Sequence, residues 1–231
     1  MPHYRALFQQ ALSEKRVRCT LCPRSCVIKD AGRGFCFGRR NINGELVLET
    51  FGRVSGFAVD PVEKKPLYHF FPGTMILSFG TIGCNLGCSF CQNWNISRCD
   101  AIDVLRAEAS PEMIAGKAKD SGVPAVAFTY NEPIVFAEFA IETAAACHYL
   151  GVKTVAVTNG YISDEARPDF FRYMDAANVD LKAFSENFYE RLCGGHLEPV
   201  LRTLQYLKRK TKVWFEITTL VIPGENDDMS E

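Results

Sequence analysis

The sequence has no excess of charge of either sign, since 26 lysines and arginines oppose 27 aspartates and glutamates for a net charge of −1. Proteins dedicated to nucleic acid usually carry a basic excess, so we expect no nucleic-acid partner. Long apolar runs are also missing, because charged residues or glycine interrupt each run well before the length of a membrane span. Residues 1–16 are charged and lack the apolar core of a signal peptide. We therefore expect a cytoplasmic protein with no membrane partner.

The composition is not that of a disordered chain either. Apolar residues make up 47% of the 231 residues, which is ample for a sizeable core. The length suits one large domain, or one domain with a small appendage.

Ten cysteines are the unusual feature of the composition. Cysteine-dense secreted domains are small and loop-rich, and this chain is neither. Most of the cysteines fall into two tight groups, and three stand alone at Cys99, Cys147 and Cys193. Thiolates clustered in this way indicate metal binding rather than a disulfide framework.

From Gly73 onward, β-type stretches alternate with helical ones. One predicted helix has clear end signals: an N-cap at Ser110, a first-turn proline at Pro111 and a stop at Gly122. Strands that alternate with helices at this spacing predict parallel βα units. The predicted strands are 75–79, 125–130, 154–158, 179–183 and 213–221, and the predicted helices are 111–121, 133–150, 163–174 and 197–210.

The preceding part of the chain has a different character. Residues 1–18 have the amphipathic spacing of a short helix, and Asn43-Gly44 is a hairpin turn signal. Residues 60–72 contain three prolines and are expected to form an extended connector. We therefore divide the chain into a Cys-rich, metal-binding N-terminal segment with a β-hairpin at 1–72 and a βα core at 73–231.

The second cysteine group has the spacing C-x3-C-x2-C and follows the first predicted strand of the core. We call Cys84, Cys88 and Cys91 the cysteine triplet. Thiolates this close can converge on a soft metal centre such as an iron–sulfur cluster. Three ligands on a four-iron cluster would leave one iron open, and an open position makes a metal site reactive. An electron-transfer cluster or a zinc loop with Cys99 as fourth ligand is the alternative.

The triplet resembles the signature of the radical S-adenosylmethionine (SAM) superfamily. The resemblance implies that the open iron chelates the methionine part of SAM. The reduced cluster would then split SAM to methionine and a 5′-deoxyadenosyl radical. Phe90 matches the aromatic residue that usually precedes the last cysteine, and is taken as a cofactor contact.

Polar residues at the ends of the next three strands are the predicted SAM contacts. Parallel βα architectures place ligands at the carboxyl ends of their strands. Glu132 takes the place of the acidic residue in the family's Gly-Gly-Glu segment, although an acidic residue also suits a helix N-terminus. Asp180 and Lys182 lie on one strand face, where paired charges are costly unless they bind each other or a ligand. They match an Asp-x-Lys segment of the family that contacts SAM. The predicted contacts are Asn131, Glu132, Thr158, Asn159, Asp180 and Lys182.

Four further cysteines lie near the N-terminus within a glycine-bearing loop. We call Cys19, Cys22, Cys26 and Cys36 the cysteine quartet. Four thiolates can close a tetrahedral zinc site or hold a second iron–sulfur cluster. The spacing alone leaves zinc, a second cluster and an unmetallated reduced loop open.

Other motifs extend the resemblance over most of residues 19–183. They are Cys-x2-Cys-Pro-x2-Cys, Lys-Pro-Leu-Tyr-His at 65–69, Thr-Tyr-Asn-Glu-Pro at 129–133 and Asn-Val-Asp-Leu-Lys-Ala at 178–183. This set resembles the AmmeMemoRadiSam system radical SAM enzyme, a relative of the pyruvate formate-lyase activating enzymes. The resemblance implies an α/β fold, namely a partial (β/α) barrel of the radical SAM type with five βα units present. It also implies a [4Fe–4S] cluster, SAM, an electron donor such as flavodoxin or ferredoxin, and a Memo-type protein partner.

The resemblance gives no substrate. Family members continue beyond the loop at 223–227, so we expect a barrel that is truncated at its C-terminus or open on one side. The leading interpretation is a radical SAM enzyme that abstracts hydrogen from an unknown substrate. A glycyl-radical enzyme activase and an electron-transfer or metal-binding module are the alternatives, and the last has no need of Asp180 and Lys182.

Overall fold

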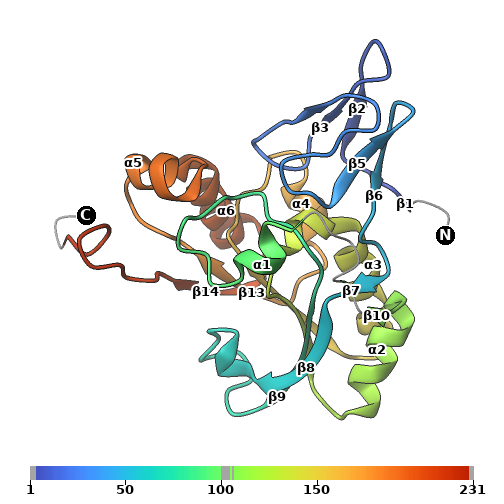
Figure 1. Ribbon diagram of the computed structural model, residues 1–231. Coiled ribbons are helices and arrows are strands. Elements are labelled where there is room, and N and C mark those ends of the chain that lie inside the picture. The colour runs from blue at the N-terminus through green and yellow to red at the C-terminus, as the bar shows by residue number, and fades with distance from the viewer. Residues whose placement is uncertain (1–3, 100–104, 106, 229–231) are drawn as a thin grey trace.

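The N-terminal part of the chain folds into short antiparallel strands, drawn in blue in Figure 1. The computed structural model describes residues 4–99, 105 and 107–228. The strands of this part are β1 (Tyr4–Arg5), β2 (Gln9–Ala11), β3 (Val17–Cys19), β4 (Val27–Ile28), β5 (Arg39–Ile42) and β6 (Glu45–Leu48). They form two small sheets, with orders β2-β3-β4 and β1-β6-β5.

The helix predicted for residues 1–18 is wrong over the described residues, and residues 1–3 lie outside them. β2 pairs with β3 in antiparallel register, with Gln9 opposite Cys19. The chain reverses between them through Glu14 and Lys15, which have positive φ angles of 57° and 55°. Strand pairing to a neighbouring segment outweighs the weak helical preference of the local sequence.

The predicted hairpin at Asn43-Gly44 is confirmed. Ile42 pairs with Glu45, so the turn has two residues and joins β5 to β6. Asn43 and Gly44 have φ angles of 55° and 90°, as the turn type favoured by Asn-Gly requires.

The core is a six-stranded sheet in the order β14-β13-β12-β11-β9-β8. The five strands from β9 to β14 are parallel, and β8 adds to the edge antiparallel to β9. This arrangement confirms the α/β fold with a partial barrel. The bounds are β8 (Gly56–Pro61), β9 (Met75–Gly80), β11 (Ala125–Phe128), β12 (Lys153–Thr158), β13 (Ala176–Asp180) and β14 (Trp214–Thr218).

One predicted strand is shifted along the chain. The sequence favours a strand at 179–183, whereas β13 spans Ala176–Asp180. Ala176 and Ala177 at its start have weak β-propensity. They are nevertheless buried in the strand, because they pair with β12 on one side and β14 on the other. Asp180 is therefore the last residue of the strand, and Lys182 lies just beyond it.

Helices connect the parallel strands, and their apolar sides pack on the sheet. Ser110 caps α2 as predicted, since its hydroxyl accepts from the Met113 N–H at 3.3 Å. The remaining elements are β7 (Arg53–Val54), η1 (Val62–Lys64), α1 (Trp94–Ser97), β10 (Ala107–Glu108), α2 (Pro111–Asp120), η3 (Pro133–Phe136), α3 (Ala137–Tyr149), α4 (Arg167–Phe171), α5 (Glu186–Phe188), η4 (Tyr189–Cys193) and α6 (Leu197–Lys210).

Two helices differ in extent from the prediction. The segment predicted as one helix at 133–150 begins as the 3-10 turn η3 before α3, and α4 is shorter than the predicted 163–174. Pro133 opens η3 and Pro168 lies in the first turn of α4, and proline lacks the N–H that an earlier helical turn would need.

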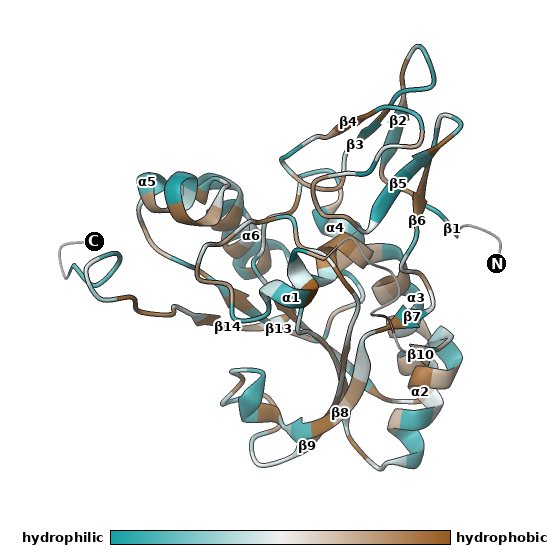
Figure 2. Ribbon diagram, viewed as in Figure 1, coloured by the Kyte–Doolittle hydropathy of each residue, from teal (hydrophilic) through white to brown (hydrophobic). Residues whose placement is uncertain are grey.

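The sheet leaves its β14 edge exposed. Trp214 and Ile217 of this strand are each about half exposed, as are Leu220 and Val221 beyond it. The segment leading from β14 toward the C-terminus is largely brown, that is, hydrophobic, in Figure 2. In the part of the chain that the structure describes, no helix has both the length and the apolarity to cross a bilayer.

Candidate radical SAM site

A cavity of about 400 Å³ lies at the carboxyl ends of the parallel strands; we call it the strand-end cavity. It is bordered by the loop after β9 and by the ends of β11, β12, β13 and β14. All of the predicted triplet and SAM-contact residues line it. These are Cys84, Cys88, Phe90, Cys91, Asn131, Glu132, Thr158, Asn159, Asp180 and Lys182.

The loop that carries the triplet is fixed by Asn131. Its side-chain oxygen accepts from the Thr81 N–H at 2.7 Å, and its amide donates to the Gly83 carbonyl at 2.9 Å. It also donates to the Thr81 hydroxyl at 3.1 Å. These bonds use both ends of the Asn131 amide, so its first role is to position the cysteine loop.

Gly83, immediately before Cys84, sits where no larger residue fits. Its φ is +94°, and a Cβ there would lie 2.0 Å from the Cys36 carbonyl oxygen. The turn that presents the triplet therefore depends on glycine. It also brings the triplet loop into contact with the segment that carries the last cysteine of the quartet.

The donor set of the triplet fits an iron–sulfur cluster. Among the described residues, only Glu186, Glu190 and His196 offer three potential ligand atoms within 4.8 Å of one another. Two thiolates on a single zinc at about 2.3 Å cannot be more than about 4.6 Å apart. The triplet sulfurs are thus too widely spaced for one zinc ion, whereas the ligands of a cluster bind different irons.

The buried carboxylate of Glu132 ties β11 to β12. It accepts from the Thr158 hydroxyl at 2.6 Å, the Asn159 N–H at 2.8 Å and the Ile134 N–H at 3.0 Å. Burial raises the pKa of Glu132 to about 7, although these hydrogen bonds oppose the rise. By accepting from the Ile134 N–H, Glu132 caps the helical turn that follows it, which is the structural alternative given in the sequence analysis. Glu132 also lines the cavity, so the two roles occur together.

Asn159 reaches the triplet directly. Its amide donates to the Asn85 side-chain oxygen at 2.9 Å and lies 3.6 Å from the Cys84 sulfur. The Cys84 sulfur also accepts from the Leu86 N–H at 3.4 Å. Hydrogen bonds to ligand sulfurs stabilise the thiolate and tune the potential of a bound cluster.

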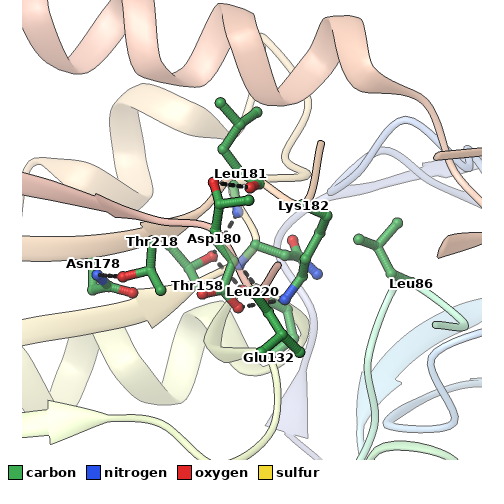
Figure 3. Close-up of polar contacts among 12 residues, drawn as sticks. Leu86, Glu132, Thr158, Asn178, Asp180, Leu181, Lys182, Thr218 and Leu220 are labelled. Atoms are coloured by element: carbon green, nitrogen blue, oxygen red, sulfur yellow. Dashed lines mark hydrogen bonds and ion pairs between the residues drawn. The ribbon is translucent and has the colours of Figure 1, made fainter. Parts of the chain in front are cut away.

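Asp180 and Lys182 form an ion pair of 2.6 Å at the end of β13, opposite Leu86 of the triplet loop (Figure 3). Burial alone would lower the pKa of Lys182, but the Asp180 carboxylate raises it. Lys182 is therefore a fixed positive charge in the cavity wall. Beside the pair, Asn178 donates to the Thr218 hydroxyl at 2.7 Å and so joins β13 to β14.

The aromatic residue of the triplet motif has a packing partner. Phe90 packs against Phe188 of α5, with ring centroids 5.8 Å apart. The triplet loop is also hydrogen-bonded to the π-helical turn η4, through Gly87 N–H to the Cys193 carbonyl at 2.8 Å and Ser89 N–H to the Leu192 carbonyl at 2.9 Å.

Cys193 is a site residue to which the sequence assigned no role. Its buried thiol hydrogen-bonds to Cys88, and this bond is the main cause of the lowered pKa of Cys88, with Lys182 also lowering it. The contact joins segments far apart in the sequence. Only the neighbouring glycines hinted at an unusual turn there.

A second part of the wall was also missed by sequence reasoning. Lys65 is buried and pairs with Asp60 at 3.1 Å, and the Tyr130 hydroxyl donates to Asp60 at 3.3 Å. The Lys65 ammonium lies 4.8 Å from the centre of the Tyr130 ring. Lys65 and Tyr130 line the cavity from the connector and from the end of β11.

The quartet lines a separate, largely enclosed cavity of about 20 Å³, which we call the quartet cavity. Arg39 borders it and is paired with Glu138 of α3, both fully buried. Asn85 of the triplet loop forms another part of its wall. The four cysteines of the quartet form no disulfide bonds in this structure.

Comparison with known proteins decides the family. Residues 79–231 match the Radical SAM superfamily, which is more than half of the chain. The chain belongs to this superfamily. Radical SAM proteins use a [4Fe–4S] cluster and SAM, so both are the cofactors of this chain, and the prediction made from the triplet is confirmed at that level.

Relatives extend the similarity toward the N-terminus. The chain is 41% identical over 226 residues to the uncharacterized protein MJ0808 of Methanocaldococcus jannaschii, covering 98% of this chain and 67% of the relative. It is 29% identical over 165 residues to the pyruvate formate-lyase 1-activating enzyme of Escherichia coli K12, covering 68% of this chain and 65% of that enzyme. The chain thus spans about two thirds of each of these relatives.

A solved structure supports the fold. The structure of TYW1 with a lysine–pyruvate adduct bound matches 74% of this chain and 68% of that chain, with a TM-score of 0.50 and 24% identity. This likeness concerns the arrangement of strands and helices. The resemblance to the AmmeMemoRadiSam system enzyme stays a prediction.

Proposed function

We propose that this radical SAM protein is an enzyme that removes a hydrogen atom from a substrate, with its cluster on the cysteine triplet and SAM in the strand-end cavity. The observation that carries the proposal is the convergence of the three thiols, the buried Glu132 and the Asp180–Lys182 pair on one cavity of about 400 Å³. When bound, the reduced cluster and SAM supply the 5′-deoxyadenosyl radical that accepts the hydrogen atom.

Lys182 and Glu132 are suited to hold the charged end of SAM. An ammonium has three donors, and Asp180 takes one from Lys182, which leaves donors for a carboxylate. A carboxylate has about four acceptor positions, and three of those on Glu132 are taken by Thr158, Asn159 and Ile134. The remaining position can accept from an amine in the cavity.

Asn131 and Asn159 act on the triplet loop. Asn131 holds the backbone at residues 81 and 83, and Asn159 donates toward the Cys84 sulfur. Apolar side chains complete the wall and limit the water that reaches the site; these include Leu86, Val157 and Leu220. The proposal requires a one-electron donor of the flavodoxin or ferredoxin class.

A glycyl-radical enzyme activase is the more specific candidate. It is favoured by the 29% identity with the pyruvate formate-lyase 1-activating enzyme over 165 residues. In that case the hydrogen atom would come from a glycine of a partner protein. A Memo-type partner stays a prediction from the sequence resemblance.

The test is SAM cleavage after anaerobic reconstitution with iron and sulfide and reduction with dithionite. We expect 5′-deoxyadenosine from the unaltered chain and from Cys147→Ala, whose thiol is buried in α3 away from both cavities. We expect none from Cys91→Ala. A cluster-loaded chain that forms no 5′-deoxyadenosine would contradict the proposal and favour an electron-transfer module.

A second measurement separates SAM binding from cluster assembly. Loss of a charged hydrogen bond of about 1.5–3 kcal/mol corresponds to a tenfold to hundredfold change in affinity. We therefore expect Lys182→Met to raise the KM for SAM about 10–100-fold while its iron content stays unchanged. An unchanged KM would show that Lys182 only neutralises Asp180.

A further inference from the structure

We propose that the cysteine quartet binds a second iron–sulfur cluster, ligated by Cys19, Cys22, Cys26 and Cys36 and separate from the SAM-binding cluster. All four side chains line the quartet cavity. Its volume of about 20 Å³ is close to the 10–15 Å³ or so that one water needs, so the quartet loop has to widen to take up a cluster. Much of the rest of its wall is apolar, including Leu21, Ile28 and Val135. Four converging thiols in such a place have the composition of a soft-metal site.

The spacing of the quartet sulfurs favours a cluster over a single zinc ion. Within the part of the chain that the structure describes, no three thiols lie within 4.8 Å of one another. One zinc at about 2.3 Å from each sulfur would require separations below about 4.6 Å. The cysteine triplet, whose cluster is established by the family, is spaced too widely by the same measure. In neither group, therefore, do three sulfurs lie close enough together for one zinc ion, whereas the ligands of a cluster bind different irons.

One positively charged group borders the quartet cavity. The Arg39 guanidinium is fully buried there and is paired with Glu138 of α3. A cationic neighbour favours the negatively charged thiolates that ligate iron.

The two cysteine groups share a wall. Asn85, next to Cys84, lines the quartet cavity, and Gly83 packs against the Cys36 carbonyl. Arg24 of the quartet loop donates to the Asn85 carbonyl and, through its second arm, to the Gly194 carbonyl. A cluster in the quartet would therefore adjoin the triplet loop. Because four protein thiols would complete its coordination, it would have no open position for SAM.

The test counts iron and acid-labile sulfide in three variants of the chain after anaerobic reconstitution and desalting. We expect about eight irons per unaltered chain, four for each cluster. The triple variant Cys84→Ser/Cys88→Ser/Cys91→Ser should keep about four, with the electron paramagnetic resonance signal of a reduced cluster after dithionite. Cys147→Ala should keep about eight, as a control for the loss of an unrelated buried thiol.

The triplet variant decides the outcome, because it lacks the three thiols that hold the SAM-binding cluster. Iron and sulfide in that variant, lost on adding Cys22→Ser and Cys36→Ser, support the proposal. A triplet variant without iron overturns it, whether it carries one zinc per chain or no metal. None of these readouts depends on SAM cleavage, so a failure here is distinguishable from a failure of the proposed function.

Discussion

The two cysteine groups differ in what surrounds them. The triplet borders a cavity of about 400 Å³ with charged and polar walls, whereas the quartet borders one of about 20 Å³ with mostly apolar walls. Three thiols beside a large polar cavity leave room for a ligand on the cluster. Four thiols around a small enclosed space leave no room for such a ligand. The contrast teaches that access and ligand number, rather than cysteine spacing alone, separate a reactive metal site from a closed one.

Each group also has a buried glutamate with a different kind of partner. Glu138, near the quartet, faces the Arg39 guanidinium, while Glu132, near the triplet, accepts only from neutral donors. Glu138 and Arg39 form a pair with no net charge that joins β5 to α3. Among the residues that the structure describes, Glu132 has no positively charged partner in the cavity wall, and its charge depends on pH.

The largest expected effect comes from the one position that both groups share. Gly83→Ala places a Cβ 2.0 Å from the Cys36 carbonyl oxygen at a φ of +94°. Backbone strain and overpacking each cost about 1–3 kcal/mol, so we expect a loss of about 2–6 kcal/mol in the free energy of unfolding. Iron at both groups should fall, as measured by metal analysis and by urea unfolding.

Gly116→Ala is the matched control for that variant. Gly116 lies in α2 with nothing within 4 Å of the added Cβ. Alanine is the better helix former, so this variant should keep its iron and gain up to about 1 kcal/mol. If Gly83→Ala lost iron at only one group, the two sites would not depend on their common wall.

The next effect concerns the buried ion pair behind the quartet. Glu138→Ala leaves Arg39 unpaired in the interior, which costs about 3–5 kcal/mol for pairs of this kind. Glu138 also accepts from the Leu7 N–H at 2.9 Å, so the N-terminal strands should loosen from α3. Urea unfolding of the metal-free chain and limited proteolysis measure the two effects.

An apolar replacement of both partners is the control. Arg39→Met/Glu138→Leu removes both charges, and such replacements are often neutral or stabilising. The double variant should therefore be more stable than Glu138→Ala alone. A double variant as unstable as the single one would mean that the pair acts through its shape and hydrogen bonds rather than its charges.

The parallel strands and the triplet were predictable because their signals are local. The Ser110 cap, the Asn43-Gly44 turn and the C-x3-C-x2-C spacing each lie within a few residues, and the structure contains the first two as predicted. Asp180 and Lys182 are also near neighbours in the sequence, so their proximity followed from strand geometry.

The other contacts of the site depend on segments far apart in the chain. Nothing in the local sequence places Cys193 against Cys88, or Lys65 and Asp60 beside Tyr130. The predicted helix at 1–18 failed for the same reason, because β2 gains its hydrogen bonds from β3. Sequence periodicity reports which face of an element is apolar, and it does not report the partner.

The smallest expected effect is a pH dependence of stability that comes from Glu132. The folded pKa of Glu132 is raised by burial from 4.5 to about 7, so the folded chain holds a proton there that the unfolded chain releases. This contribution to stability is fully present below pH 4.5 and is lost as the pH rises through about 7. Within that window the free energy of unfolding should fall by up to about 1.4 kcal/mol per pH unit.

Glu132→Gln cannot ionise in either state, so this slope should be absent from the variant. The measurement is urea unfolding of the metal-free chain at several pH values from 5 to 8, with the variant subtracted from the unaltered chain. Glu165→Gln, at an exposed position, should leave the slope unchanged. Equal slopes in the unaltered chain and in Glu132→Gln would mean that Glu132 is ionised throughout. The three neutral donors around it would then be enough to stabilise its charge in the interior.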